Sequence, residues 1–64
     1  MQERELNKEE TKAIYEKTRN LEPYEIEYED QCAELYYEIE GKKYRLIYDQ
    51  DCNWFCDIAY EGDY

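Results

Sequence analysis

The stretch Ala33–Asp49, AELYYEIEGKKYRLIYD, decides the fold because it predicts an antiparallel β-hairpin. Around a turn at Gly41, two opposite-charge pairs and several apolar pairs line up across the two strands. We expect Gly41 and Lys42 to form a type II′ turn, which prefers glycine in its first position. The strands then cover about 33–40 and 43–49, with Glu38 opposite Arg45. A shift of one residue would move the apolar sets to opposite faces.

A strand over about 24–29 is predicted before the hairpin, because YEIEYE alternates strictly. One face would carry Tyr24, Ile26 and Tyr28, and the other Glu25, Glu27 and Glu29. Pairing Tyr28 with Ala33 brings the apolar faces together and sets Glu27 opposite Glu34. Like charges in directly opposite positions destabilise a sheet by roughly 0.2–1 kcal/mol. The strand is therefore expected to carry an acidic face that the fold alone does not need.

A further strand over about 54–60, WFCDIAY, is predicted to follow the hairpin. Continued alternation would direct Trp54, Cys56, Ile58 and Tyr60 inward. In this register Tyr48 lies opposite Trp54 and Ile47 opposite Phe55. The four strands would then form a meander in chain order.

A helix over about 8–19 is predicted near the start of the chain. Asn7 is a favourable N-cap, and Glu10 stands three residues later, as in a capping box. A thin apolar stripe follows at helical spacing, and Pro23 ends the segment. We therefore predict one α+β domain over residues 1–64, with an N-terminal helix packed on a three- to four-stranded antiparallel meander sheet.

The net charge of −10 is unevenly distributed. Residues 1–20 hold five acids and five bases, so the whole excess belongs to residues 21–64, which form the predicted sheet. Such a field repels nucleic acid and anionic membranes and attracts basic partners. Neither a signal peptide nor an apolar run long enough for a membrane span is evident. Three cysteines, an odd number, fit a reducing compartment, so we expect a cytoplasmic protein.

Residues for catalysis or metal binding are sparse. The chain has no histidine and no serine, and Cys32, Cys52 and Cys56 provide too few ligands for a structural zinc site. A disulfide between Cys32 and Cys52 would need loops closer than the meander provides. The segment 49–53 alternates acids but lacks the glycine and the closing glutamate of a calcium loop. We therefore expect no enzyme activity, cofactor or metal.

The predicted sheet face away from the helix has the composition of an interface. Tyr36, Ile47 and Phe55 would form an apolar row across three strands, with carboxylates around it. Alternatively, these cross-strand pairs only stabilise a small sheet. The candidate partner-binding residues are Glu25, Glu27, Glu29, Glu34, Tyr36, Glu38, Ile47, Asp49, Phe55 and Asp57.

In size, acidity and predicted helix-plus-sheet architecture, the chain resembles small phage inhibitor proteins of the anti-CRISPR and anti-restriction kind, several of which mimic DNA. These groups share no common motif, so no functional residue carries over from them. The resemblance implies an inhibitor that occupies the basic nucleic-acid site of a protein or complex, without binding nucleic acid itself. The alternative is a regulatory or structural interaction module, either a monomer or a weak homodimer through Tyr36, Ile47 and Phe55.

Overall fold

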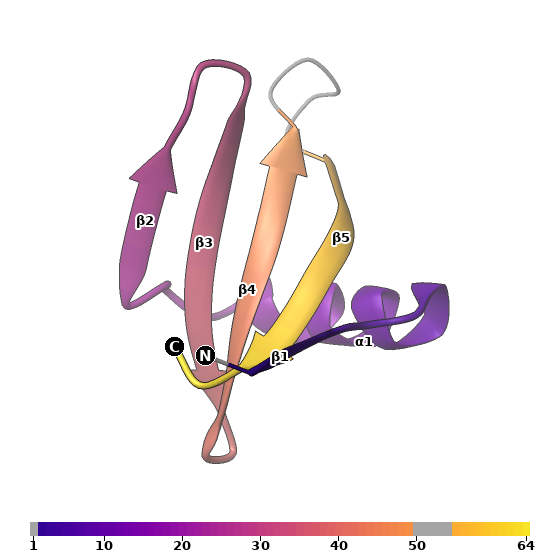
Figure 1. The fold of residues 1–64 in the computed structure, drawn as a ribbon. Coiled ribbons are helices and arrows are strands. Elements are labelled where there is room, and N and C mark those ends of the chain that lie inside the picture. Colours follow the sequence, from indigo (N-terminus) through magenta and orange to yellow (C-terminus); the bar gives the residue numbers. More distant parts are fainter. Residues whose placement is uncertain (1, 50–54) are drawn as a thin grey trace.

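The computed structural model describes residues 2–49 and 55–64, apart from the side chains of Phe55 and Asp57. It contains one helix and a five-stranded antiparallel sheet in the order β1-β5-β4-β3-β2 (Figure 1). The elements are β1 (Glu3–Glu5), α1 (Lys8–Thr18), β2 (Glu25–Tyr28), β3 (Cys32–Ile39), β4 (Lys42–Asp49) and β5 (Phe55–Gly62). The α+β class is confirmed, but the sheet has five strands rather than the predicted three to four.

Helix α1 begins with the predicted capping box. The Asn7 side chain accepts a hydrogen bond from the Glu10 backbone N–H at 2.8 Å, and the Glu10 carboxylate accepts one from the Asn7 N–H at 3.0 Å. Two of the unpaired donors at the helix start are thereby satisfied. The buried stripe of the helix consists of Thr11, Ile14 and Thr18.

The β3–β4 hairpin forms, but its predicted turn was wrong. Ile39 pairs with Lys42, so the two loop residues are Glu40 and Gly41 rather than Gly41 and Lys42. Both have positive φ, 53° and 80° respectively, which indicates a type I′ turn. The register differs from the predicted one by two residues, and Glu38 therefore lies opposite Lys43 instead of Arg45. Because a two-residue shift leaves every side chain on its predicted face, the core is unaffected.

Strand β2 pairs with β3 in the predicted register, with Tyr28 opposite Ala33 and Glu27 opposite Glu34. Tyr24, however, precedes the strand and does not join its apolar face. Its ring lies 6.1 Å from that of Tyr36 on the opposite face of the sheet. The strict alternation of the sequence is thus broken at its first residue.

Strand β5 contains a β-bulge that the sequence alternation did not predict. Tyr48 pairs with Cys56, whereas the neighbouring Ile47 pairs with Ile58, so Asp57 is the extra residue. Beyond the bulge every side chain changes face, and Ala59 rather than Ile58 enters the core. The predicted inward positions of Ile58 and Tyr60 were therefore wrong. The predicted pairs of Tyr48 with Trp54 and Ile47 with Phe55 were also wrong, and Trp54 itself lies outside the described residues.

Strand β1 was not predicted because its three residues, Glu-Arg-Glu, carry no apolar pattern. It pairs with the end of β5, with Glu3 opposite Gly62 and Glu5 opposite Tyr60. The sequence between β1 and α1 places Leu6 in the core, where it is 6% exposed. Leu6 N–H donates to the Ala59 carbonyl at 2.9 Å, which fixes the start of the helix against the sheet.

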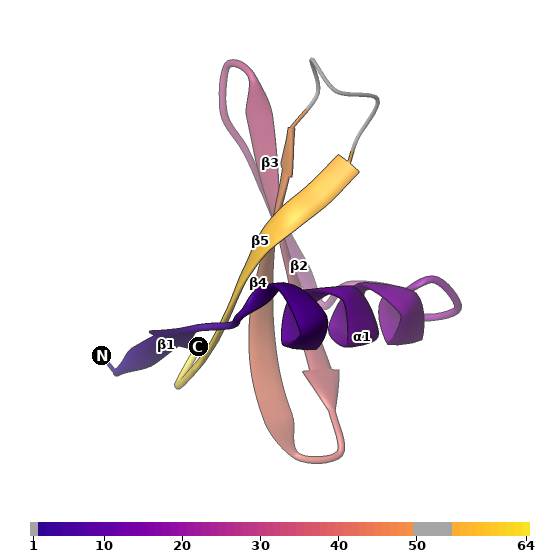
Figure 2. The same cartoon turned by 90° about the vertical axis from the view of Figure 1, so that its right-hand side faces the viewer.

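One apolar layer joins α1 to the sheet. Its buried residues are Leu6, Ile14, Tyr37, Tyr44, Leu46, Cys56 and Ala59. Figures 1 and 2 show α1 running across the strand direction, and α1 packs chiefly against β5. Among the described residues, no helix has the length and apolar character required to span a bilayer. We call the sheet face opposite α1 the open face.

Candidate protein-binding surface

Arg45 lies at the centre of the open face, where it is bound by two carboxylates. Its Nη2 atom donates to both oxygens of Glu3, at 3.0 and 3.2 Å, and its Nη1 atom donates to Glu34. Burial alone would lower the pKa of Arg45, but hydrogen bonds with Tyr64 and Glu34 and the charge of Glu3 raise it above its ordinary value. Arg45 is thus a fully charged cation that the protein itself neutralises.

Tyrosine rings surround this ion cluster. The guanidinium carbon of Arg45 lies 4.6 Å from the centroid of the Tyr60 ring and 5.7 Å from that of Tyr64. Tyr64 packs edge-to-face against Tyr36, with the centroids 5.4 Å apart, and its hydroxyl donates to Glu3. Such cation–π and aromatic contacts each contribute on the order of 1 kcal/mol when partly desolvated. The centre of the open face is therefore a cluster whose opposite charges pair with each other, while the buried Arg45 Nε atom has no hydrogen-bond partner among the described residues.

The β2 side of the open face is acidic and has no such neutralisation. Glu25, Glu27 and Glu29, here called the acidic strip, are all exposed. The ion pairs of the described residues involve only Arg4 and Arg45 and none of these three carboxylates. A hydrogen bond with Glu25, desolvation and the charges of Glu25, Glu34 and Glu29 raise the pKa of Glu27. The acidic strip therefore has a negative potential that the protein does not compensate.

The remaining predicted contact residues surround the centre of the open face. Glu38 is exposed opposite Lys43, and Asp49 is exposed at the far end of β4. The Lys43 ammonium group lies 5.7 Å from the Tyr24 ring centroid, where it makes a cation–π contact. The side chains of Phe55 and Asp57 lie outside the description.

The predicted apolar row does not form in the expected way. Tyr36 lies opposite Arg45, and Ile47 lies opposite Glu34 on β3 and Ile58 on β5. Tyr36 and Ile47 are both partly buried, and Tyr36 is flanked by two other tyrosine rings. Glu34, expected to be free for a partner, is 7% exposed and bonded to Arg45.

The sequence interpretation missed the residues that organise this face: Glu3, Arg45, Tyr60 and Tyr64. Arg45 had a usable signal, because it alternates with Tyr44 and Leu46 and so had to point away from the core. Tyr60 was assigned to the wrong face because of the bulge. Glu3 has no comparable signal, since the strand that positions it has no apolar residue.

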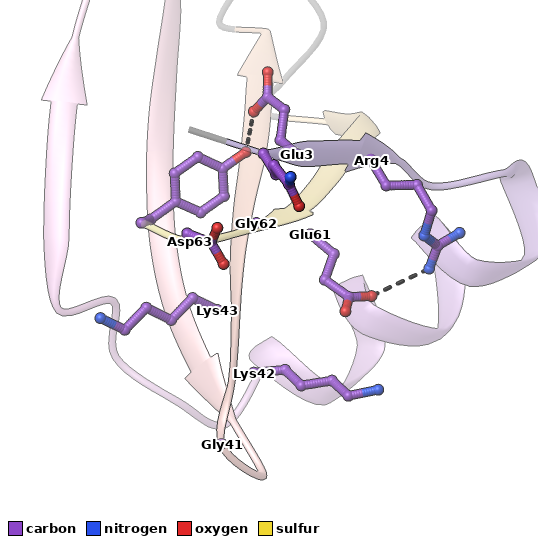
Figure 3. Close-up of a pocket in the computed structure, with 10 residues that line it drawn as sticks. Glu3, Arg4, Gly41, Lys42, Lys43, Glu61, Gly62 and Asp63 are labelled. Atoms are coloured by element: carbon purple, nitrogen blue, oxygen red, sulfur yellow. Dashed lines mark hydrogen bonds and ion pairs between the residues drawn. The ribbon is translucent and has the colours of Figure 1, made fainter.

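An open hollow of about 640 Å³ lies between the β3–β4 turn and the ends of β1 and β5 (Figure 3). Its charged lining residues are Glu3, Arg4, Lys42, Lys43, Glu61 and Asp63. Lys42 and Lys43 point in opposite directions, and Arg4 is bonded to Glu61 at 3.1 Å and to Glu10. Because cations and carboxylates are mixed and do not converge on one point, the hollow has no evident specificity for an ion.

Groups for metal binding or thiol chemistry do not converge within residues 2–49 and 55–64. That part of the chain holds no group of three or more His, Cys, Asp or Glu side chains that could bind a metal. Cys32 is partly buried there and Cys56 is buried, with its Sγ donating to the Ile58 carbonyl at 3.5 Å, whereas Cys52 and most of the 49–53 segment lie outside the description. Desolvation, together with a hydrogen bond to Glu29 and nearby carboxylates, raises the pKa of the Cys32 thiol. A raised pKa disfavours the reactive thiolate.

Comparisons with family models, curated proteins and solved structures found no match.

Proposed function

We propose that this chain is a small acidic binding protein that inhibits a nucleic-acid-binding protein or complex, such as a CRISPR or restriction system, by occupying its basic nucleic-acid site. The observation that carries the proposal is the uncompensated acidic strip beside a neutralised centre. A sheet face selected only for stability would mix charges of both signs. Here the sole arginine of residues 21–64 is bound internally, while Glu25, Glu27 and Glu29 remain exposed.

The spacing of the strip supports a phosphate-like role. Alternate carboxylates on one face of a strand are about 6.6 Å apart. Phosphates in DNA advance about 3.4 Å along the axis per strand and also rotate around it, so their separation exceeds that rise. Charges arranged in this way set the encounter rate and specificity of a partner rather than most of its affinity. Apolar contacts from Tyr36 and Ile47, at the less exposed centre of the face, would contribute to affinity.

Competition with DNA tests this function. The protein would be immobilised and used to capture partners from a lysate of the host cell, and the column would then be washed with duplex DNA at constant ionic strength. We expect the DNA to release the partner, and a gradient of salt alone to release it as well. A partner that binds DNA and this protein simultaneously would contradict the proposal.

Matched charge variants test whether the strip itself is responsible. The double substitution Glu25→Gln and Glu27→Gln removes two charges from the strip, and Glu16→Gln with Glu22→Gln removes two exposed charges elsewhere. We expect the first variant to lose most partner capture and the second to retain it. Equal capture by both would show that the strip is not the contact. Salt-insensitive self-association in sedimentation would instead favour the homodimeric interaction module.

A further inference from the structure

Strand β2 forms one edge of the sheet, and no element of the described chain covers that edge (Figure 1). The Glu29 N–H donates to the Cys32 carbonyl at 2.9 Å, which makes these two residues a hydrogen-bonded pair. Such pairs alternate along an antiparallel ladder. The backbone groups of Glu25 and Glu27 therefore point to β3, and those of Ile26 and Tyr28 point outward from the edge. Unpaired groups of this kind are a template for an added strand.

The side chains of this edge have a two-sided pattern. Ile26 is 42% exposed and Tyr28 is 69% exposed on the face toward α1, and the helix packs chiefly against β5 at the other side of the sheet. Glu25 and Glu27 are exposed on the open face. A complementary strand would therefore carry apolar side chains on one face and cationic side chains on the other, in strict alternation.

A second copy of this chain does not meet that requirement. Two antiparallel β2 strands would place glutamates against glutamates on the open face, where repulsion already exists. The opposite edge, β1, carries Glu3 and Glu5 on the same face, so head-to-tail pairing would also gather carboxylates. The charge of the edge therefore selects a basic occupant over self-association.

We propose that the outer edge of β2 binds an extended segment of a partner protein as a sixth, antiparallel strand, in which lysine or arginine alternates with apolar residues. The cationic residues would lie beside Glu25 and Glu27, and the apolar residues beside Ile26 and Tyr28. This inference rests on the proposed function for the positive charge of the partner. It goes further in assigning the contact to backbone hydrogen bonds of β2.

A peptide of alternating lysine and valine, about seven residues long so that it spans β2 at ~3.3 Å per residue, tests the inference. In the proposed complex each valine lies opposite Ile26 or Tyr28, so valine N–H groups donate to β2 and lysine N–H groups point away. N-methylation of the valine amides should therefore weaken binding at least about tenfold, whereas N-methylation of the lysine amides should change it by less than about twofold. Binding of the unmethylated peptide should also slow hydrogen exchange at Ile26 and Tyr28 in NMR spectra.

Three results would overturn the inference: no binding of the alternating peptide, equal binding of the two methylated peptides, or equal binding of a peptide with the same composition but grouped lysines. On the protein side, Ile26→Pro removes an outward N–H without removing a bond to β3, and it should abolish binding. The methylated peptides keep the test valid if this variant does not fold. If DNA still releases the partner in the capture experiment while the peptides fail, the edge inference alone is wrong.

Discussion

Glu27 and Glu34 lie directly opposite each other, yet their surroundings differ. The Glu34 carboxylate accepts a hydrogen bond from Arg45 in a site where the Glu34 side chain is 10% exposed. Glu27 is exposed, and a hydrogen bond with Glu25, desolvation and the charges of nearby carboxylates raise its pKa. From the predicted pairing alone, each of the two carboxylates would destabilise the sheet. The structure supports this only for Glu27.

We predict that Glu34→Gln lowers the free energy of unfolding by about 1–2 kcal/mol, because a charge-assisted hydrogen bond in a buried site is replaced by a neutral one. Glu27→Gln is the matched control and should raise the melting temperature at neutral pH. A carboxyl whose pKa is raised by folding stabilises the fold while protonated, and this contribution is lost as the pH rises through the raised pKa. The advantage of Glu27→Gln should therefore disappear at acidic pH. Thermal melts of both variants at pH 4 and pH 7 check this, and stabilisation by Glu34→Gln would contradict it.

At the scale of elements, the β3–β4 hairpin contains a local conflict between sequence and conformation. Glu40 has a φ of 53° although it is not a glycine, and left-handed conformations cost most residues roughly 1–2 kcal/mol. Asparagine followed by glycine is the preferred pair for a type I′ turn. The cross-strand pairs that flank the loop thus impose a conformation that Glu40 does not favour.

We predict that Glu40→Asn raises the free energy of unfolding by up to about 1 kcal/mol, because asparagine tolerates the left-handed region better than glutamate does. Gly41→Ala is the opposing variant. Its added Cβ meets no atom within 4 Å, so any loss of stability comes from the φ of 80° alone and should be about 1 kcal/mol. Urea unfolding measures both changes. A turn centred on Gly41 and Lys42 would instead leave Glu40→Asn without effect.

Elements with long apolar alternation were predictable, and their exact pairing was less so. The faces of β3 and β4 were correct despite a two-residue error in register, because only odd shifts exchange faces. The bulge at Asp57 was not predictable, because Ile58 and Ala59 are both apolar and the sequence therefore shows no break where the inward and outward positions exchange. Strand β1 was not predictable either, because only its pairing with β5 defines it.

One part of the candidate site could also be predicted from the sequence, and another part could not. The acidic strip could be predicted because it lies on the alternating strand β2 and the residue that follows it, and the register of β2 was correct. The cluster around Arg45 could not, because it joins Glu3 from β1, Glu34 from β3 and Tyr64 from beyond β5. These residues are brought together only by a strand that was missed and by a chain segment that follows the bulge. Long-range pairing rather than local pattern determines which carboxylates are neutralised.

At the scale of the whole molecule, tyrosine supplies much of the packing on both faces of the sheet. The chain has nine tyrosines, and only one phenylalanine and one tryptophan. Tyr37 and Tyr44 belong to the core beneath α1, and Tyr48 packs against it, whereas Tyr36, Tyr60 and Tyr64 cover the open face. A tyrosine buried in this way must remain neutral, because burial penalises the phenolate. We therefore expect the free energy of unfolding to fall at alkaline pH.

Burial raises the pKa of Tyr48 to about 12, and burial with the hydrogen bond to Glu3 raises the pKa of Tyr64 to about 12. An unperturbed tyrosine has a pKa of about 10. Because the folded-state values are raised, these groups stabilise the fold below about pH 10, and their contribution is lost as the pH rises toward 12. We predict that the free energy of unfolding, measured in urea, falls steeply over this interval.

Tyr64→Phe should be less stable at neutral pH, because it lacks the bond to Glu3, but its stability should decline less steeply. Lysine titration is common to both proteins and cancels in their difference, so parallel declines would show that Tyr64 is not protected by the open face.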